Sequence, residues 1–149
     1  MFSPELINQP SAFSVDLSRI REIFWHLSII PLAQNGILNI AFLSDEEIRV
    51  LNHDHRWIDS TTDVLSFHYF EDFSELGSDE VAGEIILSES RILSQAMEHG
   101  HTPERELEIL IIHSILHILG FDHETDEEYE EMWKWEEGLR GNLVDKYII

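Results

Sequence analysis

Residues 103–123 read PERELEILIIHSILHILGFDH and contain the most apolar helical pattern in the chain. Thr102 precedes Pro103, which is the order of a helix cap followed by proline at the first helical position. Gly120 can adopt the left-handed conformation that commonly ends a helix. The stretch therefore predicts a buried helix over residues 103–119, followed by a turn.

Outward from this helix, shorter patterns predict a small sheet and further helices. Short apolar runs rich in β-branched residues predict strands over residues 37–43, 63–67 and 83–87. Apolar spacing and cap residues predict helices within 16–32, 45–52, 88–98 and 125–137. The order of these elements predicts an α+β fold, a single compact domain over residues 1–149 with a small mixed β-sheet and helices packed mainly on one face. An all-α domain is the alternative.

Composition excludes several classes of protein. The 149 residues are 43% hydrophobic, which is enough for a core, and no run of about 18 apolar residues predicts a membrane span. The absence of cysteine excludes disulfides, cysteine nucleophiles and Cys-ligated zinc. Nine Lys and Arg against thirty Asp and Glu give a net charge of −21, which excludes a broad basic face for nucleic acid. We therefore expect a cytoplasmic protein with no membrane or DNA partner.

Three histidines in the 103–123 stretch predict a metal site on the buried helix and the turn after it. His113 and His117 are one helical turn apart, so both imidazoles project from one face. The chain reverses after Gly120, and His123 can return to the same ion. Three neutral imidazoles suit Zn²⁺, at one ion per chain, and could also take another divalent metal such as Ni²⁺. Asp122 is the nearest carboxylate and is not expected to be a ligand, which leaves a fourth position open to water, as in catalytic sites.

The spacing H-x-x-x-H-x-x-G-x-x-H is also that of metzincin proteases. Those enzymes need a glutamate directly after the first histidine as the general base. Ser114 occupies that position and cannot serve as a base. The sequence therefore predicts the metal geometry without support for peptide hydrolysis.

Two blocks of the sequence resemble one known family. HSILHILGFDH at 113–123 resembles the H-G-x-L-H-L-x-G-Y-D-H signature of the YbeY endoribonucleases, the metal-dependent rRNA maturation factors of bacteria. Leu51-Asn52-x-x-x-Arg56 with T-D-V-L-S-F at 62–67 resembles the family's second block, and G-E-I at 83–85 resembles one of its strands. The resemblance covers about residues 37–139, with three departures in the signature, which are Ser114 for Gly, Ile118 for Leu and Phe121 for Tyr.

The resemblance implies a function and a set of site residues. It implies an endoribonuclease that cleaves single-stranded RNA in 16S rRNA 3′-end maturation and ribosome quality control, with ribosomal particles as partners. It also implies a zinc-like ion on His113, His117 and His123, with Arg56 and His113 as catalytic residues. Arg56 suits a phosphate because its planar guanidinium can donate two parallel hydrogen bonds.

The residues themselves leave two questions open. No general base is identifiable: His68, His99 and His101 are available, and Glu106 is either a residue supporting the metal ligands or a solvated surface carboxylate. Two other functions also remain open: a metallohydrolase of another substrate, and a metal-stabilised, non-catalytic ribosome-assembly factor. The acidic surface of such a factor could dock on basic ribosomal proteins.

Overall fold

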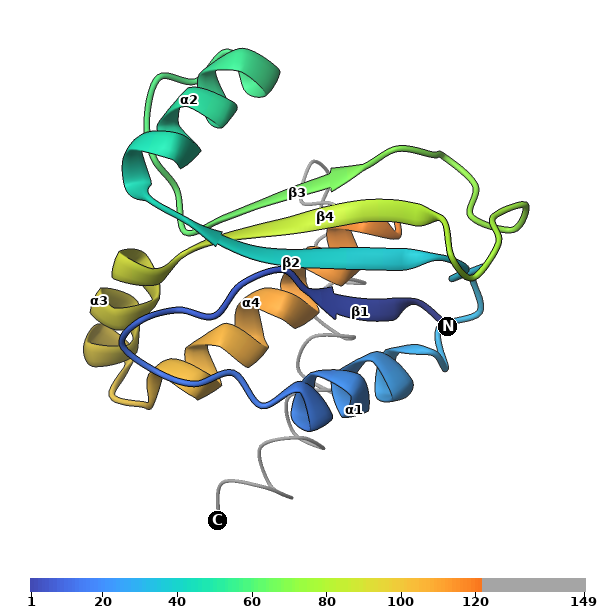
Figure 1. Ribbon diagram of the computed structural model, residues 1–149, viewed down its shortest axis with the longest axis horizontal. Helices are drawn as coiled ribbons and strands as arrows, with labels where there is room; N and C mark the ends of the chain where they lie inside the picture. The colour runs from blue at the N-terminus through green and yellow to red at the C-terminus, as the bar shows by residue number, and fades with distance from the viewer. Residues whose placement is uncertain (122–149) are drawn as a thin grey trace.

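The computed structural model describes residues 1–121, which form four strands and four helices (Figure 1). The strands are β1 (Ser3–Leu6), β2 (Ile37–Leu43), β3 (Val64–His68) and β4 (Val81–Ser88). The helices are α1 (Leu17–Leu27), α2 (Asp45–Arg56), α3 (Glu89–His99) and α4 (Pro103–Ile118). The predicted α+β class is confirmed, and the all-α alternative is wrong.

The strands form one mixed sheet in the order β1-β2-β4-β3. Strands β1, β2 and β4 are parallel, and β3 runs antiparallel to β4 at the edge of the sheet. Gly83 of β4 permits the close approach of β3, because a Cβ atom there would lie 2.2 Å from the carbonyl oxygen of Phe67. Strand β3 is therefore an edge strand, and it pairs with the sheet through β4 alone.

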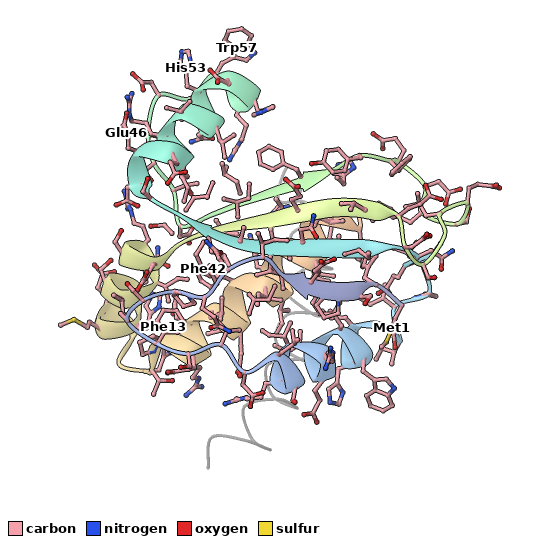
Figure 2. The ribbon with its side chains drawn as sticks, viewed as in Figure 1. Met1, Phe13, Phe42, Glu46, His53 and Trp57 are labelled. Atoms are coloured by element: carbon pink, nitrogen blue, oxygen red, sulfur yellow. The ribbon has the colours of Figure 1, made fainter. Side chains whose placement is uncertain are left out.

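Helices α1, α3 and α4 lie on one side of the sheet, and α2 lies on the other (Figure 1). Alternate residues of β2 are buried, and they join residues of α1 and α4 in the main core. Phe13, in the segment before α1, meets Phe42 of β2 edge to face at 6.1 Å between ring centroids (Figure 2). Helix α4 is buried around most of its circumference, so the predicted apolar helix is the central element of this core.

A smaller cluster attaches α2 to the opposite face of the sheet. Ile48 of α2 packs with Leu65 of β3 and Ile86 of β4. At the start of α2, Asp45 accepts hydrogen bonds from the hydroxyls of Ser88 and Ser90, and these bonds hold the pKa of its carboxyl below the ordinary value. The apolar contacts of Ile48 and the hydrogen bonds of Asp45 together fix the direction of α2 relative to the sheet.

Three features of the elements differ from the expectations or lie beyond the described residues. Helix α2 was expected to end at Asn52, but it continues to Arg56. Strand β1 was not expected from the sequence. The predicted helix over residues 125–137 lies outside the described residues. Among the residues that are described, no helix combines the length and the apolar character needed to cross a membrane.

Candidate functional site

A cleft of about 540 Å³ opens where the end of α2, strand β3 and the second half of α4 meet. It contains three of the four predicted site residues, Arg56, His113 and His117, although Arg56 is more than fifty positions from the histidines. The fourth, His123, lies outside the described residues. The remaining lining residues come from β3, from the segment before it and from α4: Thr62, Asp63, Val64, Leu65, Ser66, His68 and Ile118.

The two histidines of α4 face each other across one helical turn. Their Nε2 atoms are 2.8 Å apart, and their ring centroids are 4.4 Å apart with the planes inclined at 78°. Only one proton can lie between two nitrogens at this distance, so at least one Nε2 presents a lone pair. Two neutral imidazoles in this arrangement can direct both lone pairs at one cation, and nitrogen donors of this kind suit Zn²⁺. The donor set therefore fits a divalent metal ion.

Ser114 points away from this cleft although it follows His113 directly. Its side chain is fully buried, it does not line the cleft, and its hydroxyl makes no hydrogen bond within residues 1–121. A side chain at this position of α4 is directed into the core because one residue turns the helix by about 100°. The position that carries the general base in metzincins is thus turned away from this site.

Arg56 stands at the C-terminal end of α2, whereas the sequence predicted that this helix ends at residue 52, before Arg56. Trp57 ends the helix in the left-handed conformation, with φ of 58°. Asn52 is buried, and its side-chain amide N–H donates to the backbone carbonyl of Ser60 at 2.9 Å, while the backbone carbonyl of Asn52 accepts from the Ile58 backbone N–H at 3.3 Å. These bonds fold the following segment back onto α2 and fix the helix end beside the cleft.

The guanidinium of Arg56 is exposed, and no carboxylate in the described part of the chain forms an ion pair with it. This contrasts with Arg49 on the same helix, which pairs with both Glu46 and Asp59. An arginine at a cleft without a carboxylate partner among residues 1–121 is available there for an anionic ligand.

Strand β3 and the segment before it contribute residues to the cleft that were not predicted as site residues. Asp63 is held in place because its Oδ1 accepts from the backbone of Val64 at 2.8 Å and from the hydroxyl of Thr62 at 3.2 Å. The signal for these residues was the T-D-V-L-S-F block, which follows Arg56 in the sequence and lies along the cleft in the structure.

His68 lies at the end of β3 with a defined tautomer. Its Nδ1 is 2.9 Å from the carbonyl oxygen of Phe70. A carbonyl only accepts hydrogen bonds, so Nδ1 carries the proton and Nε2 of the neutral ring is a proton acceptor. Of the three histidines considered as general bases, His68 is the one that lines the cleft.

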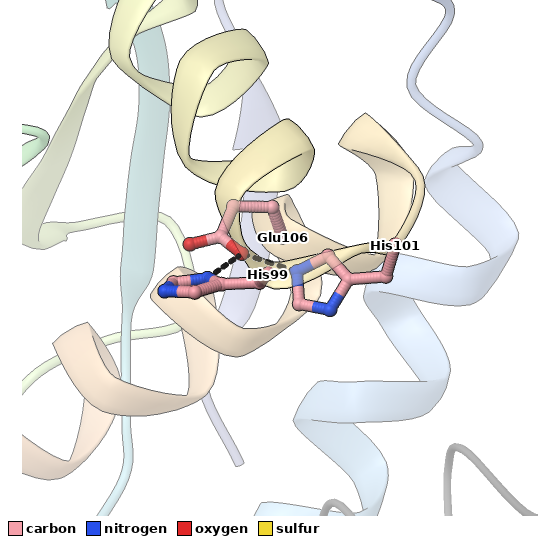
Figure 3. A group of neighbouring side chains, drawn as sticks. All are labelled: His99, His101 and Glu106. Atoms are coloured by element: carbon pink, nitrogen blue, oxygen red, sulfur yellow. Dashed lines mark hydrogen bonds and ion pairs between the residues drawn. The ribbon is translucent and has the colours of Figure 1, made fainter.

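The other two, His99 and His101, gather around Glu106 at the opposite end of α4 (Figure 3). Glu106 is 2% exposed, so the interpretation as a solvated surface carboxylate is wrong. One donor atom from each of the three side chains lies within 4.8 Å of the others, which is compatible with metal binding. The sequence missed this group because its members come from two helices and the turn between them.

Comparison with known proteins places the chain in a family. A family model described as Endoribonuclease YbeY matches residues 7–143. The chain is 35% identical over 135 residues to Endoribonuclease YbeY of Shouchella clausii, covering 85% of this chain and 84% of the relative. It is 45% identical over 116 residues to Endoribonuclease YbeY of Caldanaerobacter subterraneus, covering 71% and 73%. The solution structure of a Thermotoga maritima protein superposes with a TM-score of 0.60 at 26% identity, covering 99% of this chain and 91% of that one. These matches confirm the resemblance seen in the sequence, and the chain belongs to the YbeY endoribonuclease family.

Proposed function

We propose that this protein is a metal-dependent endoribonuclease that cleaves single-stranded RNA. The observation that carries the proposal is the cleft that unites an imidazole pair, His113 and His117, with the guanidinium of Arg56. His123, five positions after the end of α4 in the sequence, completes the proposed ligand set for one divalent ion. Zn²⁺ is the first choice because of the nitrogen donors, and Ni²⁺ is the second.

Hydrolysis of RNA makes demands that this cleft can meet. The attacking water oxygen bonds to phosphorus and loses a proton, while the leaving oxygen separates and gains one. A divalent ion on the three histidines would act as a Lewis acid toward a phosphoryl oxygen and favour deprotonation of water. Arg56 would hold two phosphoryl oxygens through its fork of N–H donors. His68, with Nε2 as an acceptor, is the residue that we assign to proton transfer.

Family membership extends the proposal to a biological substrate. The relatives are named endoribonucleases, and the family resemblance points to 16S rRNA 3′-end maturation and ribosome quality control. Ribosomal particles would present both the RNA and basic proteins. A chain with a net charge of −21 can dock on basic ribosomal proteins while the cleft engages RNA.

The decisive experiment uses the full chain, stripped of metal with a chelator and reloaded with Zn²⁺. We expect the loaded protein to cleave a short single-stranded RNA and the stripped protein to be inactive. His117→Ala should lose about one ion per chain and RNA cleavage together, because the two imidazoles that remain lose most of the chelate geometry. His53→Ala is the matched control, since His53 is exposed on α2 and does not line the cleft.

Each other outcome contradicts the proposal in a specific way. Cleavage of RNA by the stripped protein, or by His117→Ala at the parental rate, would exclude the metal-dependent mechanism. A fully loaded protein that leaves RNA intact would support the non-catalytic assembly factor. Casein, incubated in parallel, should remain intact, and its metal-dependent cleavage would identify a metallohydrolase of another class.

A further inference from the structure

We propose that His99, His101 and Glu106 form a second metal site, which binds a divalent transition-metal ion at the corner between α3 and α4 (Figure 3). This site is separate from the cleft and goes beyond the proposed nuclease function. The proposal rests on the position, burial and donor chemistry of the three side chains.

The backbone of the corner fixes where the three side chains point. Helix α3 ends at His99, and Gly100 takes the left-handed conformation with φ of 69°. The backbone N–H of His101 then donates to the Ala96 carbonyl at 3.0 Å, which closes the helix end in a Schellman arrangement. Thr102 then caps α4 directly, which places Glu106 in the first turn of this helix, beside the corner. The ligands are thus preorganised by two consecutive helix caps.

Both imidazoles approach the same carboxylate oxygen. Nδ1 of His99 is 3.0 Å from Oε2 of Glu106, and Nε2 of His101 is also within hydrogen-bond distance of that oxygen. The side chain of Glu106 is only 3% exposed, and that of His101 is 13% exposed. With neutral imidazoles the group holds one buried negative charge, which is costly to keep away from water. A divalent cation bound by the same three atoms would neutralise this charge.

The donor set selects the class of ion. Two imidazole nitrogens and one carboxylate suit Zn²⁺, Co²⁺, Ni²⁺ or Cu²⁺, whereas Mg²⁺ and Ca²⁺ prefer oxygen donors. Tetrahedral ligands at ordinary Zn–N and Zn–O lengths are about 3.4 Å apart. The shorter contact from His101 to Glu106 therefore has to lengthen by more, whereas the contact from His99 needs to lengthen by only a few tenths of an ångström. The side chain of His99 is 54% exposed, and it can make this adjustment and leave one side of the ion to water.

Distance along α4 separates this ion from the chemistry in the cleft. Glu106 precedes His113 by seven residues, which is about 10.5 Å of helix rise. Paired catalytic metals lie about 3.5–4 Å apart, so the two proposed ions cannot act on one phosphate together. The second ion would therefore fasten α3 to the start of the helix that carries His113 and His117.

The test counts Zn²⁺ in the full chain by native mass spectrometry, after chelation and titration with Zn²⁺ alone. The His117→Ala background removes the proposed cleft ion, and we expect one ion to remain. Adding His99→Ala should lower the affinity for this remaining Zn²⁺ by about 100-fold or more, because losing a direct ligand costs at least as much affinity as losing a residue that supports a ligand. His53→Ala is the control in the same background, since its side chain is 53% exposed and lies on α2, far from this corner (Figure 2).

A second variant protects the test against a folding artefact. Glu106→Gln keeps the size of the buried side chain and should also lose the ion, with circular dichroism reporting whether α3 and α4 persist. Unchanged Zn²⁺ binding after His99→Ala, or no bound ion in the His117→Ala background, would leave the group as a hydrogen-bonded cluster and overturn the proposal. None of these results depends on RNA cleavage, so the experiment tests the second metal site independently of the nuclease function.

Discussion

Arg56 is the residue whose role separates catalysis from metal binding, because it lines the cleft without being a candidate ligand. If its guanidinium holds the scissile phosphate, Arg56→Ala should lower RNA cleavage by about 10²-fold or more, as is typical for the loss of one charge-stabilising donor. Arg56→Lys should recover only part of the rate, since an ammonium lacks the bidentate fork. Single-turnover rates at equal metal content would measure both effects.

The control for this experiment is Arg21→Ala, which removes the same charge from an exposed position on α1, away from the cleft. It should cleave RNA at the parental rate. Equal rates for Arg56→Ala and the parent would show that Arg56 is an ordinary surface residue and that the phosphate is held elsewhere.

At the residue scale, the sequence predicted side chains that act within one helix and missed those that act between elements. His113 and His117 could be predicted because four residues make about one turn, and the structure does place their Nε2 atoms together. Glu106 was ambiguous because its burial depends on α3 packing beside it, which no spacing within α4 reveals. The sequence could not distinguish His68 from His99 and His101 as a general base, because only the fold shows that the end of β3 lies at the cleft.

Helix α2 is the element that carries Arg56, and its stability depends on its N-terminal cap. Ser44 and Glu47 form a reciprocal capping box, in which the Glu47 N–H donates to the Ser44 hydroxyl at 3.2 Å. Ser44→Ala removes this acceptor and should lower the free energy of unfolding by about 1 kcal/mol. Urea denaturation should show a lower midpoint with an unchanged m-value.

Ser18→Ala in α1 is the matched substitution, because only the backbone N–H of Ser18 takes part in its helix cap. This variant should be neutral or slightly stabilising, since alanine has the higher helix propensity. A midpoint for Ser44→Ala that equals that of Ser18→Ala would contradict a stabilising cap on α2.

The same helix shows which element boundaries a sequence can predict. Its start was predicted because the capping box is a local pattern. Its end was not, since His53-Asp54-His55-Arg56 contains no apolar residue to continue the helical spacing, and the stop is a left-handed tryptophan rather than a glycine. Strand β1 was missed for a related reason: SPEL is short and contains proline, and it becomes a strand only by pairing with β2 more than thirty residues later.

The whole molecule carries a net negative charge, which is the same sign as the charge of its proposed RNA substrate. A net charge of −21 repels polyanionic RNA, and only local features such as Arg56 and a bound cation can attract it. The Debye length falls from about 30 Å at 10 mM salt to about 10 Å at 100 mM, so added salt screens the repulsion of the distant acidic surface first. We therefore expect cleavage of dilute RNA to become faster as salt rises through this range, and to slow only when the direct phosphate contacts are screened at higher concentrations.

Initial rates with a short single-stranded RNA, at concentrations well below KM and at constant Zn²⁺, would measure this effect as kcat/KM. The rise should be much smaller at saturating RNA, because the repulsion acts on the encounter and not on the bound complex. A nuclease that meets RNA through a basic face loses affinity steadily as salt increases. A steady fall from 10 mM upward would therefore mean that the acidic surface is remote from the path of the RNA, or that a basic surface formed by the chain guides RNA to the cleft.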